Sequence, residues 1–173
     1  MNIRKATVED DDAVWAVHES AFPEKERERI AACAAGLLDT DLNPGAVSWV
    51  AEVEGEVVGH VAFSPLIDSS SNSVCGSILA PVAVKKTVHG KGIGRALIEH
   101  GICHERGKGV EVLVVYGDPE FYGRFGFTAE AAEAISPPYD LEHPFGWQGI
   151  DFRKNKQKVM VQCVASLQDP ELW

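Results

Sequence analysis

The segment from Leu79 to Ile98, Leu-Ala-Pro-Val-Ala-Val-Lys-Lys-Thr-Val-His-Gly-Lys-Gly-Ile-Gly-Arg-Ala-Leu-Ile, decides the fold. It starts in a β-rich run (74–84), passes through three glycines within five residues (90–94), and continues with the apolar spacing of a helix. An almost wholly apolar run (110–116) follows, as expected of a central strand. This order of strand, glycine loop, helix and strand predicts a right-handed crossover between parallel strands.

The rest of the chain adds further strands and helices around this crossover. Thr7 begins a capping pattern, Glu54-Gly55 marks a hairpin, and Pro81 indicates a bulge or an unpaired strand edge. The other predicted elements are strands 2–6, 47–53 and 57–63, helices 7–21 and 24–38, a short helix after Asp118-Pro119, a strand opening at Gly126-Phe127, and a last strand 159–167. Together they predict an α/β (mixed α+β) protein whose mixed sheet has helices on both faces. The length of 173 residues predicts a single domain, 1–173.

The charge distribution points to a bound polyanion at the glycine loop. The net charge of −10 argues against a nucleic-acid partner, which requires a basic face. The stretch 69–98 nevertheless contains no Asp or Glu, where the overall acid content (26 of 173) would place about four or five. Lys85, Lys86, Lys91 and Arg95 lie in the same stretch. An acidic protein has therefore kept one segment locally cationic.

Composition also bounds location and metal content. No apolar run is long enough for a membrane span and no signal peptide is evident, so we expect a cytoplasmic protein without a membrane partner. The four cysteines form no Cys-x-x-Cys pair. His100-x-x-Cys103-His104 brings three metal-capable side chains together on one helix, but no second ligand pair follows, so we predict no metal.

A glycine loop at a helix start binds phosphate because the first N–H groups of the helix have no partners and oxygens can approach the backbone closely. The loop lacks the Lys-Ser/Thr of a Walker A motif, and Arg95 stands where a dinucleotide fingerprint needs its third glycine. The alternative is a loop that only makes a tight strand-to-helix connection. Three glycines and an acid-free flank favour phosphate binding.

Two blocks resemble a known family. The segment 79–98 is similar to motif A of the GNAT-type N-acetyltransferase superfamily, and Phe121-Tyr122-Gly123-Arg124-Phe125-Gly126-Phe127 is similar to its motif B. The opening Ile3-Arg4-Lys5-Ala6-Thr7 also resembles the superfamily's start, so the resemblance covers about 2–128. The stretches 59–65 and 117–119 further resemble a subgroup of small bacterial predicted acetyltransferases.

The resemblance implies a GNAT-like, mostly antiparallel twisted sheet and the cosubstrate acetyl-CoA. It implies that Val82, Ala83 and Val84 bind the pantetheine arm. It also implies a pyrophosphate site at the loop, made by His89, Gly90, Lys91, Gly92, Ile93, Gly94 and Arg95. Tyr122 would protonate the departing thiolate. The sequence departs from the family in having His89 where Gln or Arg is common, and in lacking an Asn before motif B.

The resemblance implies acetyl transfer to a primary amine by direct attack in a ternary complex. His60, on the strand after the hairpin, is the candidate general base, because the ordinary pKa of histidine is about 6.5. A purely structural His60 is the competing interpretation. The acceptor is left open between a small molecule and a protein amine, and a homodimer is left open. The segment 129–158 is a candidate for shaping the acceptor pocket.

Two other functions compete with catalysis. A catalytically degenerate member of the same fold would hold acyl-CoA as a sensor or scaffold, and a nucleotide-binding regulator would use the glycine loop differently. Retention of Tyr122 favours the enzyme over the sensor, and the missing Lys-Ser/Thr disfavours the regulator.

Overall fold

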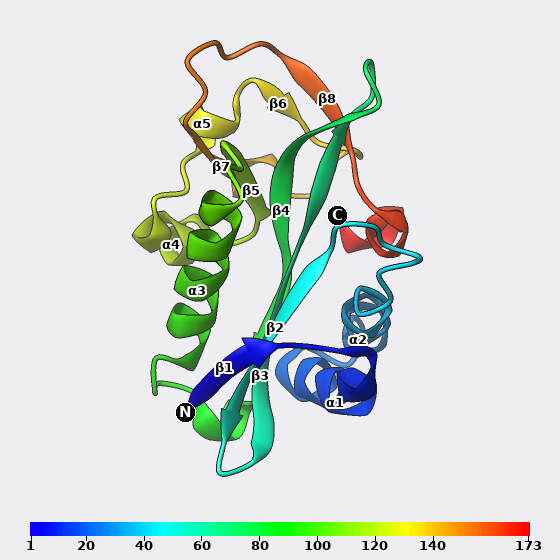
Figure 1. Ribbon diagram of the computed structural model, residues 1–173, viewed down its shortest axis with the longest axis vertical. Helices are drawn as coiled ribbons and strands as arrows, with labels where there is room; N and C mark the ends of the chain where they lie inside the picture. The colour runs from blue at the N-terminus through cyan, green and yellow to red at the C-terminus, as the bar shows by residue number, and fades with distance from the viewer.

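The computed structural model describes all residues, 1–173, and Figure 1 shows a long twisted sheet between two groups of helices. The strands are β1 (Asn2–Lys5), β2 (Val47–Val53), β3 (Glu56–Asp68), β4 (Ser73–Val84), β5 (Val112–Tyr116), β6 (Ile135–Ser136), β7 (Trp147–Asp151) and β8 (Val159–Gln162). The α-helices are α1 (Asp11–Ala21), α2 (Arg27–Gly36), α3 (Ile93–Gly107), α4 (Pro119–Tyr122) and α5 (Ala129–Ala132).

The strands form one eight-stranded, mostly antiparallel sheet. Its main order is β1-β2-β3-β4-β5-β7, and β8 pairs with both β3 and β6. Only β4–β5 and β6–β8 run parallel. The parallel β4–β5 pair is joined through α3, so the predicted crossover and the mixed, mostly antiparallel sheet are confirmed.

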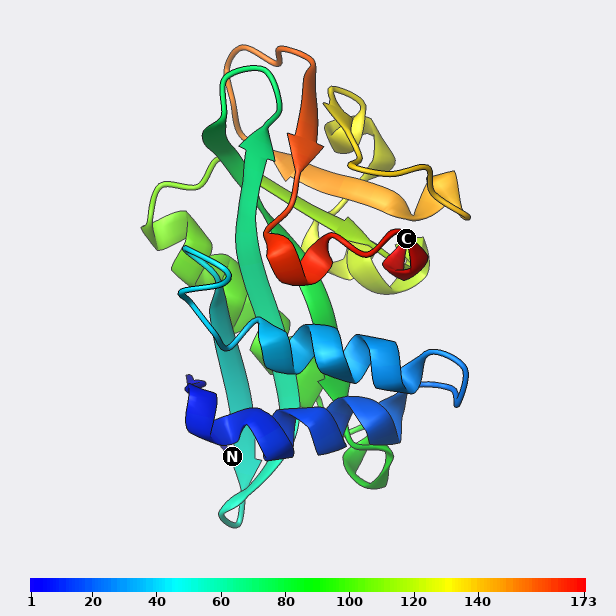
Figure 2. The same cartoon turned by 90° about the vertical axis from the view of Figure 1, so that its right-hand side faces the viewer.

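Helices cover both faces of the sheet, as predicted. α3 packs on one face, where Ile93, Leu97 and Ile98 join apolar residues of β2 to β5 in one buried cluster. α1 and α2 pack on the other face, with Val14 and Ala34 among the buried residues. Figure 2 shows α1 and α2 crossing this face together, with the C-terminal helical turns (red) beside them.

The first helix starts as its cap predicts. Thr7 and Asp10 form a capping box around a 3₁₀ turn (8–10), and α1 continues from Asp11. Arg4 holds both oxygens of Asp10 at 2.7 and 2.8 Å and also bonds Glu52, which ties the helix start to β1 and β2. The second helix is shorter than the predicted range 24–38.

Two predictions at the C-terminal end were wrong in extent or type. The strand predicted to open at Gly126-Phe127 is absent: Thr128 makes one isolated bridge to Gly149. The hydroxyl of Thr128 accepts from the N–H of Ala131 at 3.1 Å and so caps α5. The last strand ends at Gln162, and a 3₁₀ turn occupies 165–167.

Pro81 lies where β4 leaves its parallel partner. The β3–β4 register shifts between the pairs Val61–Val82 and Phe63–Leu79, which makes a bulge around Pro81. The β4–β5 pairing ends at Leu79–Val115. Beyond Leu79 this edge of β4 is therefore free, as the proline predicted.

Candidate active site

The glycine loop presents unpaired backbone donors at the start of a long helix. Gly92 is the N-cap of α3 with φ 76°, and Gly90 has φ 77°, a left-handed conformation that glycine adopts without strain. The N–H groups of Gly90, Lys91 and Gly92 donate to no protein atom, and the first turn of α3 contains no acidic residue. No neighbouring atom lies within 4 Å of the position that a Cβ would take at Gly90 or at Gly92. These features are typical of a loop that binds anions through its backbone.

The cationic side chains around the loop are only partly neutralised. Lys85 pairs with Glu56 at 2.6 Å, and Arg95 pairs with Glu99 at 2.8 Å. Lys86 and Lys91 are exposed and make no ion pair. The two free lysines leave the loop with a net positive field.

His89 helps to order this loop through a hydrogen bond to the strand before it. Its Nε2 lies 2.8 Å from the carbonyl oxygen of Val84, so this nitrogen carries the proton and donates. The ring is exposed. The side chain therefore contributes to the shape of the loop, whose backbone offers the donors.

An apolar inner cavity of about 360 Å³ lies where β4 and β5 separate. Pro81 and Val82 line it from β4, Tyr116 and Gly117 from β5 and the turn after it, and Tyr122 from α4. Phe22, Ile30 and Leu172 are among the apolar residues that close the remaining sides. The cavity adjoins the free edge of β4, which leads away toward the glycine loop.

The ring of Tyr122 is fixed by close packing. A Cβ at Gly117 would lie 2.4 Å from its Cε2, so only glycine fits there. Phe121 and Phe127 contact the ring edge-on, with centroids 5.0 and 6.1 Å away. Burial raises the pKa of Tyr122 to about 12, and the nearby carboxylate of Asp118 adds to this shift. The phenol therefore stays protonated near neutral pH.

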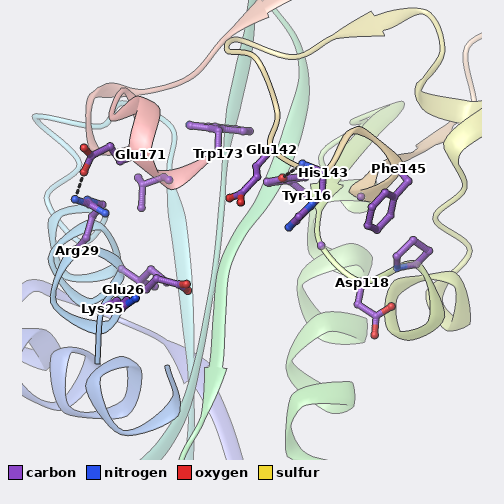
Figure 3. Close-up of a pocket in the computed structure, with 15 residues that line it drawn as sticks. Lys25, Glu26, Arg29, Tyr116, Asp118, Glu142, His143, Phe145, Glu171 and Trp173 are labelled. Carbon is purple, nitrogen blue, oxygen red and sulfur yellow. Dashed lines mark hydrogen bonds and ion pairs between the residues drawn. The ribbon is translucent and has the colours of Figure 1, made fainter. Parts of the chain in front are cut away.

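A larger and more polar outer cavity of about 700 Å³ opens from the same walls (Figure 3). Both cavities are lined by Tyr116, Gly117, Asp118 and Trp173. The segment 142–146 forms part of the outer wall, where the N–H of His143 donates to the hydroxyl of Tyr116 at 2.9 Å. The two cavities therefore adjoin at these shared walls.

The three predicted arm-binding residues alternate between the faces of the sheet. Val82 and Val84 pack beside the cluster under α3, while Ala83 is buried on the α1 side. Only Val82 of the three lines the inner cavity. The geometry brings Val82 and Tyr122 together at one end of the free edge and leaves the glycine loop at the other.

His60 lies away from both cavities. It is fully buried on the α1 side of β3, and its Nδ1 lies 2.8 Å from Nε2 of His18. Burial lowers the pKa of His60 to about 3 and the pKa of His18 well below its ordinary value. A neutral, fully buried histidine that lines neither cavity favours the structural interpretation of His60.

The cavity-lining residues that no sequence motif indicates come mainly from the C-terminal segment. Leu172 and Trp173 line both cavities, although neither belongs to a motif. Trp173 stacks on Tyr116 with centroids 6.3 Å apart, and its indole N–H donates to the carbonyl oxygen of Leu167 at 3.1 Å. No local sequence pattern predicts these contacts, because they join segments that are far apart in the chain.

The suspected metal-capable cluster has another role. His100 and His104 contact the ring of Trp49 edge-on, with centroids 4.3 and 5.0 Å away. No group of three His, Cys, Asp or Glu side chains is placed to hold a metal ion. None of the helices has both the length and the apolar character needed to cross a membrane.

Comparison with known families decides the affiliation. A family model described as an acetyltransferase (GNAT) domain matches residues 44–129, which contain the glycine loop, the crossover and Tyr122. The chain belongs to the GNAT family.

Curated relatives of this GNAT chain include two proteins of Escherichia coli K12. It is 36% identical to the uncharacterised N-acetyltransferase YjhQ over 117 residues. These residues make up 65% of this chain and 65% of YjhQ. It is 38% identical to the uncharacterised N-acetyltransferase YhbS over 78 residues. These residues make up 45% of this chain and 46% of YhbS. The matched parts thus span about two thirds and about half of these relatives.

Solved GNAT structures match nearly the whole fold. A GNAT family acetyltransferase from Brucella melitensis, solved in complex with acetyl-CoA, is 28% identical with a TM-score of 0.77, over 96% of this chain and 97% of that one. The E. coli YhbS structure, solved in complex with CoA, is 24% identical with a TM-score of 0.81, over 97% and 92% of the two chains. The eight-stranded sheet with α3 crossing between β4 and β5 is therefore a GNAT fold.

Proposed function

We propose that the chain works as a single acetyl-CoA-dependent N-acetyltransferase domain that transfers the acetyl group directly to a primary amine. One observation carries the proposal: the free edge of β4 runs from an anion-ready loop to a cavity holding a protonated tyrosine. The family match and the acetyl-CoA bound to the Brucella relative support it.

The residues present fit a CoA thioester. The unpaired N–H groups of 90–92 and those at the start of α3 would hold the pyrophosphate, with Lys86 and Lys91 adding positive charge. The unpaired edge at 82–84 would accept the extended pantetheine arm as an added strand. Bound there, acetyl-CoA would supply an acetyl group already activated as a thioester.

No enzyme nucleophile is required in this scheme. The amine nitrogen attacks the thioester carbonyl carbon, a C–N bond forms, the C–S bond breaks, and the amine loses one proton. Tyr122 gives a proton to the departing sulfur and is reprotonated from solvent. A backbone N–H near Val82 would receive the developing oxyanion.

Cys33, the cavity's own thiol, is poorly suited to form an acyl-enzyme. It lines the inner cavity, but burial raises its pKa to about 12. Because the thiolate is the reactive form, a thiol with this pKa is a weak nucleophile near neutral pH. This supports direct attack by the amine in a ternary complex.

The position of His60 leads us to propose a mechanism without it as the base. The apolar inner cavity disfavours the charged form of an entering amine and so lowers its pKa. The amine would then lose its proton to water on entry and react in the neutral form. His60 keeps a packing role with His18.

The loop is tested by Gly92→Asp against Gly109→Asp. Both glycines have left-handed φ (76° and 84°) and open space around them, so both changes strain the backbone alike. Only Asp at position 92 places a negative charge where the pyrophosphate would bind. We expect acetyl-CoA at a hundredfold excess over Kd to raise Tm by about 5–11 °C in the wild type and in Gly109→Asp. We expect no shift in Gly92→Asp and none with NAD.

An equal shift in the two variants would show that the loop is only a turn. A shift with NAD but not with acetyl-CoA would overturn the function itself. Saturable acetyl-CoA binding without turnover of any amine would instead favour an acyl-CoA sensor.

A further inference from the structure

The outer cavity carries an excess of negative charge that acetyl-CoA binding does not explain. Four carboxylates line it, from Glu26, Asp118, Glu142 and Glu171, against the two cations Lys25 and Arg29. Such a wall repels the phosphates of a CoA, which the cationic loop at the far end of β4 would hold. The outer cavity is therefore suited to the second substrate.

The carboxylates differ in how far they are already neutralised. Arg29 forms ion pairs with Glu171 and with Asp169, so this cation and Glu171 satisfy each other. Glu26 and Glu142 make no ion pair within the protein. Figure 3 shows their carboxylates pointing into the gap from opposite sides, Glu26 from the α2 side and Glu142 from the segment before β7.

The two cavities give an entering molecule two unlike environments in sequence. The inner part, beside Tyr122, is mostly apolar and favours a neutral amine. The outer part, between Glu26 and Glu142, favours a positive charge. Between them stand the aromatic rings of Tyr116 and Trp173, which tolerate an alkyl chain or a cation.

We propose that the acceptor is a flexible aliphatic di- or polyamine whose reacting nitrogen enters the inner cavity while a second, protonated nitrogen lies between Glu26 and Glu142. This inference rests on the proposed acetyl transfer and names the substrate class for the same site. A monoamine leaves the outer carboxylates without a partner. An amino acid brings its own carboxylate toward them and is repelled.

The experiment measures binding by calorimetry to protein saturated with CoA, so that it does not depend on turnover. The probes are putrescine, n-butylamine and γ-aminobutyrate, which share a four-carbon chain and differ in the far group. We expect putrescine to bind about ten-fold more tightly than n-butylamine, and γ-aminobutyrate to bind most weakly. Added salt should reduce the preference for putrescine, because the contact of its second, protonated nitrogen with Glu26 and Glu142 is exposed and electrostatic.

Variants assign the effect to the two carboxylates. Glu26→Gln and Glu142→Gln keep size and polarity, and both positions are exposed, so folding should persist. Each should weaken putrescine binding about two- to five-fold and leave n-butylamine unchanged. Glu133→Gln is the matched control, an exposed glutamate that lines neither cavity, and it should change nothing.

Equal binding of putrescine and n-butylamine would overturn the inference, as would an equal effect of Glu133→Gln. Tighter binding of tryptamine than of putrescine would overturn it too, by assigning recognition to the aromatic rings. Acetylation assays on the same amines separate the two proposals. If putrescine still binds more tightly than n-butylamine but no amine is acetylated, only the proposal of acetyl transfer is contradicted. If amines are acetylated but putrescine and n-butylamine bind equally, only the proposal of a diamine acceptor is contradicted.

Discussion

The ring of Tyr122 is held in place by groups that leave its hydroxyl free. Gly117 and Phe127 fix the ring, Asp118 caps the short helix that carries it, and no protein group hydrogen-bonds to the phenol. Its pKa of about 12 makes it a weaker acid than an ordinary thiol with a pKa near 8.5. The same apolar surroundings would raise the pKa of a thiol held beside it, which reduces the difference between the pKa of the thiol and the pKa of Tyr122.

Tyr122→Phe should therefore act on turnover. The ring and its packing stay, while the proton donor is lost, so kcat should fall about 10²–10⁴-fold with little change in the KM for acetyl-CoA. Steady-state rates across pH check this, with Tyr139→Phe, a half-buried tyrosine that lines neither cavity, as the control. Because a phenol with a pKa of about 12 stays protonated, the wild-type rate should show no falling limb up to about pH 10. Wild-type turnover by Tyr122→Phe would leave the residue a packing role only.

The His18–His60 pair makes a separate prediction about stability. Both histidines are buried with lowered pKa values, so the unfolded chain takes up protons near pH 6.5 while the folded chain does not. Stability should be full above about pH 6.5 and fall as pH drops, by up to about 1.4 kcal/mol per pH unit for each histidine. His60→Gln should flatten this slope, and the exposed His143→Gln should not. Urea unfolding at several pH values measures it, and an unchanged slope in His60→Gln would contradict the assignment.

At the scale of elements, the closest approach of α3 to β3 depends on Gly101. A Cβ at Gly101 would lie 2.1 Å from Cε2 of Phe63, within the buried cluster under α3. The helix therefore lies close to the sheet there. Sequence periodicity predicts the helix but not this close approach.

Gly101→Ala should destabilise the fold by about 1–3 kcal/mol, because the added methyl group forces Phe63 to move. Gly107→Ala is the matched control on the same helix, since nothing lies within 4 Å of its Cβ position. The control should be neutral or slightly stabilising, because Ala favours a helix over Gly. Chemical denaturation of both variants gives the free energies of unfolding, and equal effects would show that the close contact is easily relieved.

The elements that the sequence predicted well are those with local signals. The glycine loop, the 3.6-residue spacing of α3 and the apolar β5 run each have a local cause, and each was predicted. The strand predicted at Gly126-Phe127 failed because Thr128 acts as a helix cap, a signal that the Thr-Ala-Glu-Ala-Ala pattern carries. Strand alternation correctly predicted that His60 faces the other side of the sheet from Val61 and Phe63. It did not predict that helix α1 covers His60 on that side.

At the scale of the whole molecule, the cavities are assembled from segments that share no motif. α2, the turn after β5, the segment 142–146 and the C-terminal residues meet around Tyr116 and Trp173. Their meeting depends on long-range packing, such as the stacking of Trp173 on Tyr116. The motifs therefore predicted the site that we propose for the acetyl donor, whereas the cavities that we propose for the acceptor became visible only in three dimensions.

The most direct test of acetyl transfer follows both products of one reaction. Wild-type protein is mixed with acetyl-CoA and a panel of primary amines that includes polyamines, monoamines, aromatic amines and amino acids, and acetylated amine is detected by mass spectrometry while free thiol is titrated. We expect at least one amine to gain one acetyl group, with an equal amount of CoA thiol released, and a strong loss of both signals in Tyr122→Phe. Thiol release without an acetylated amine, or acetyl-CoA binding with no product from any amine, would contradict it.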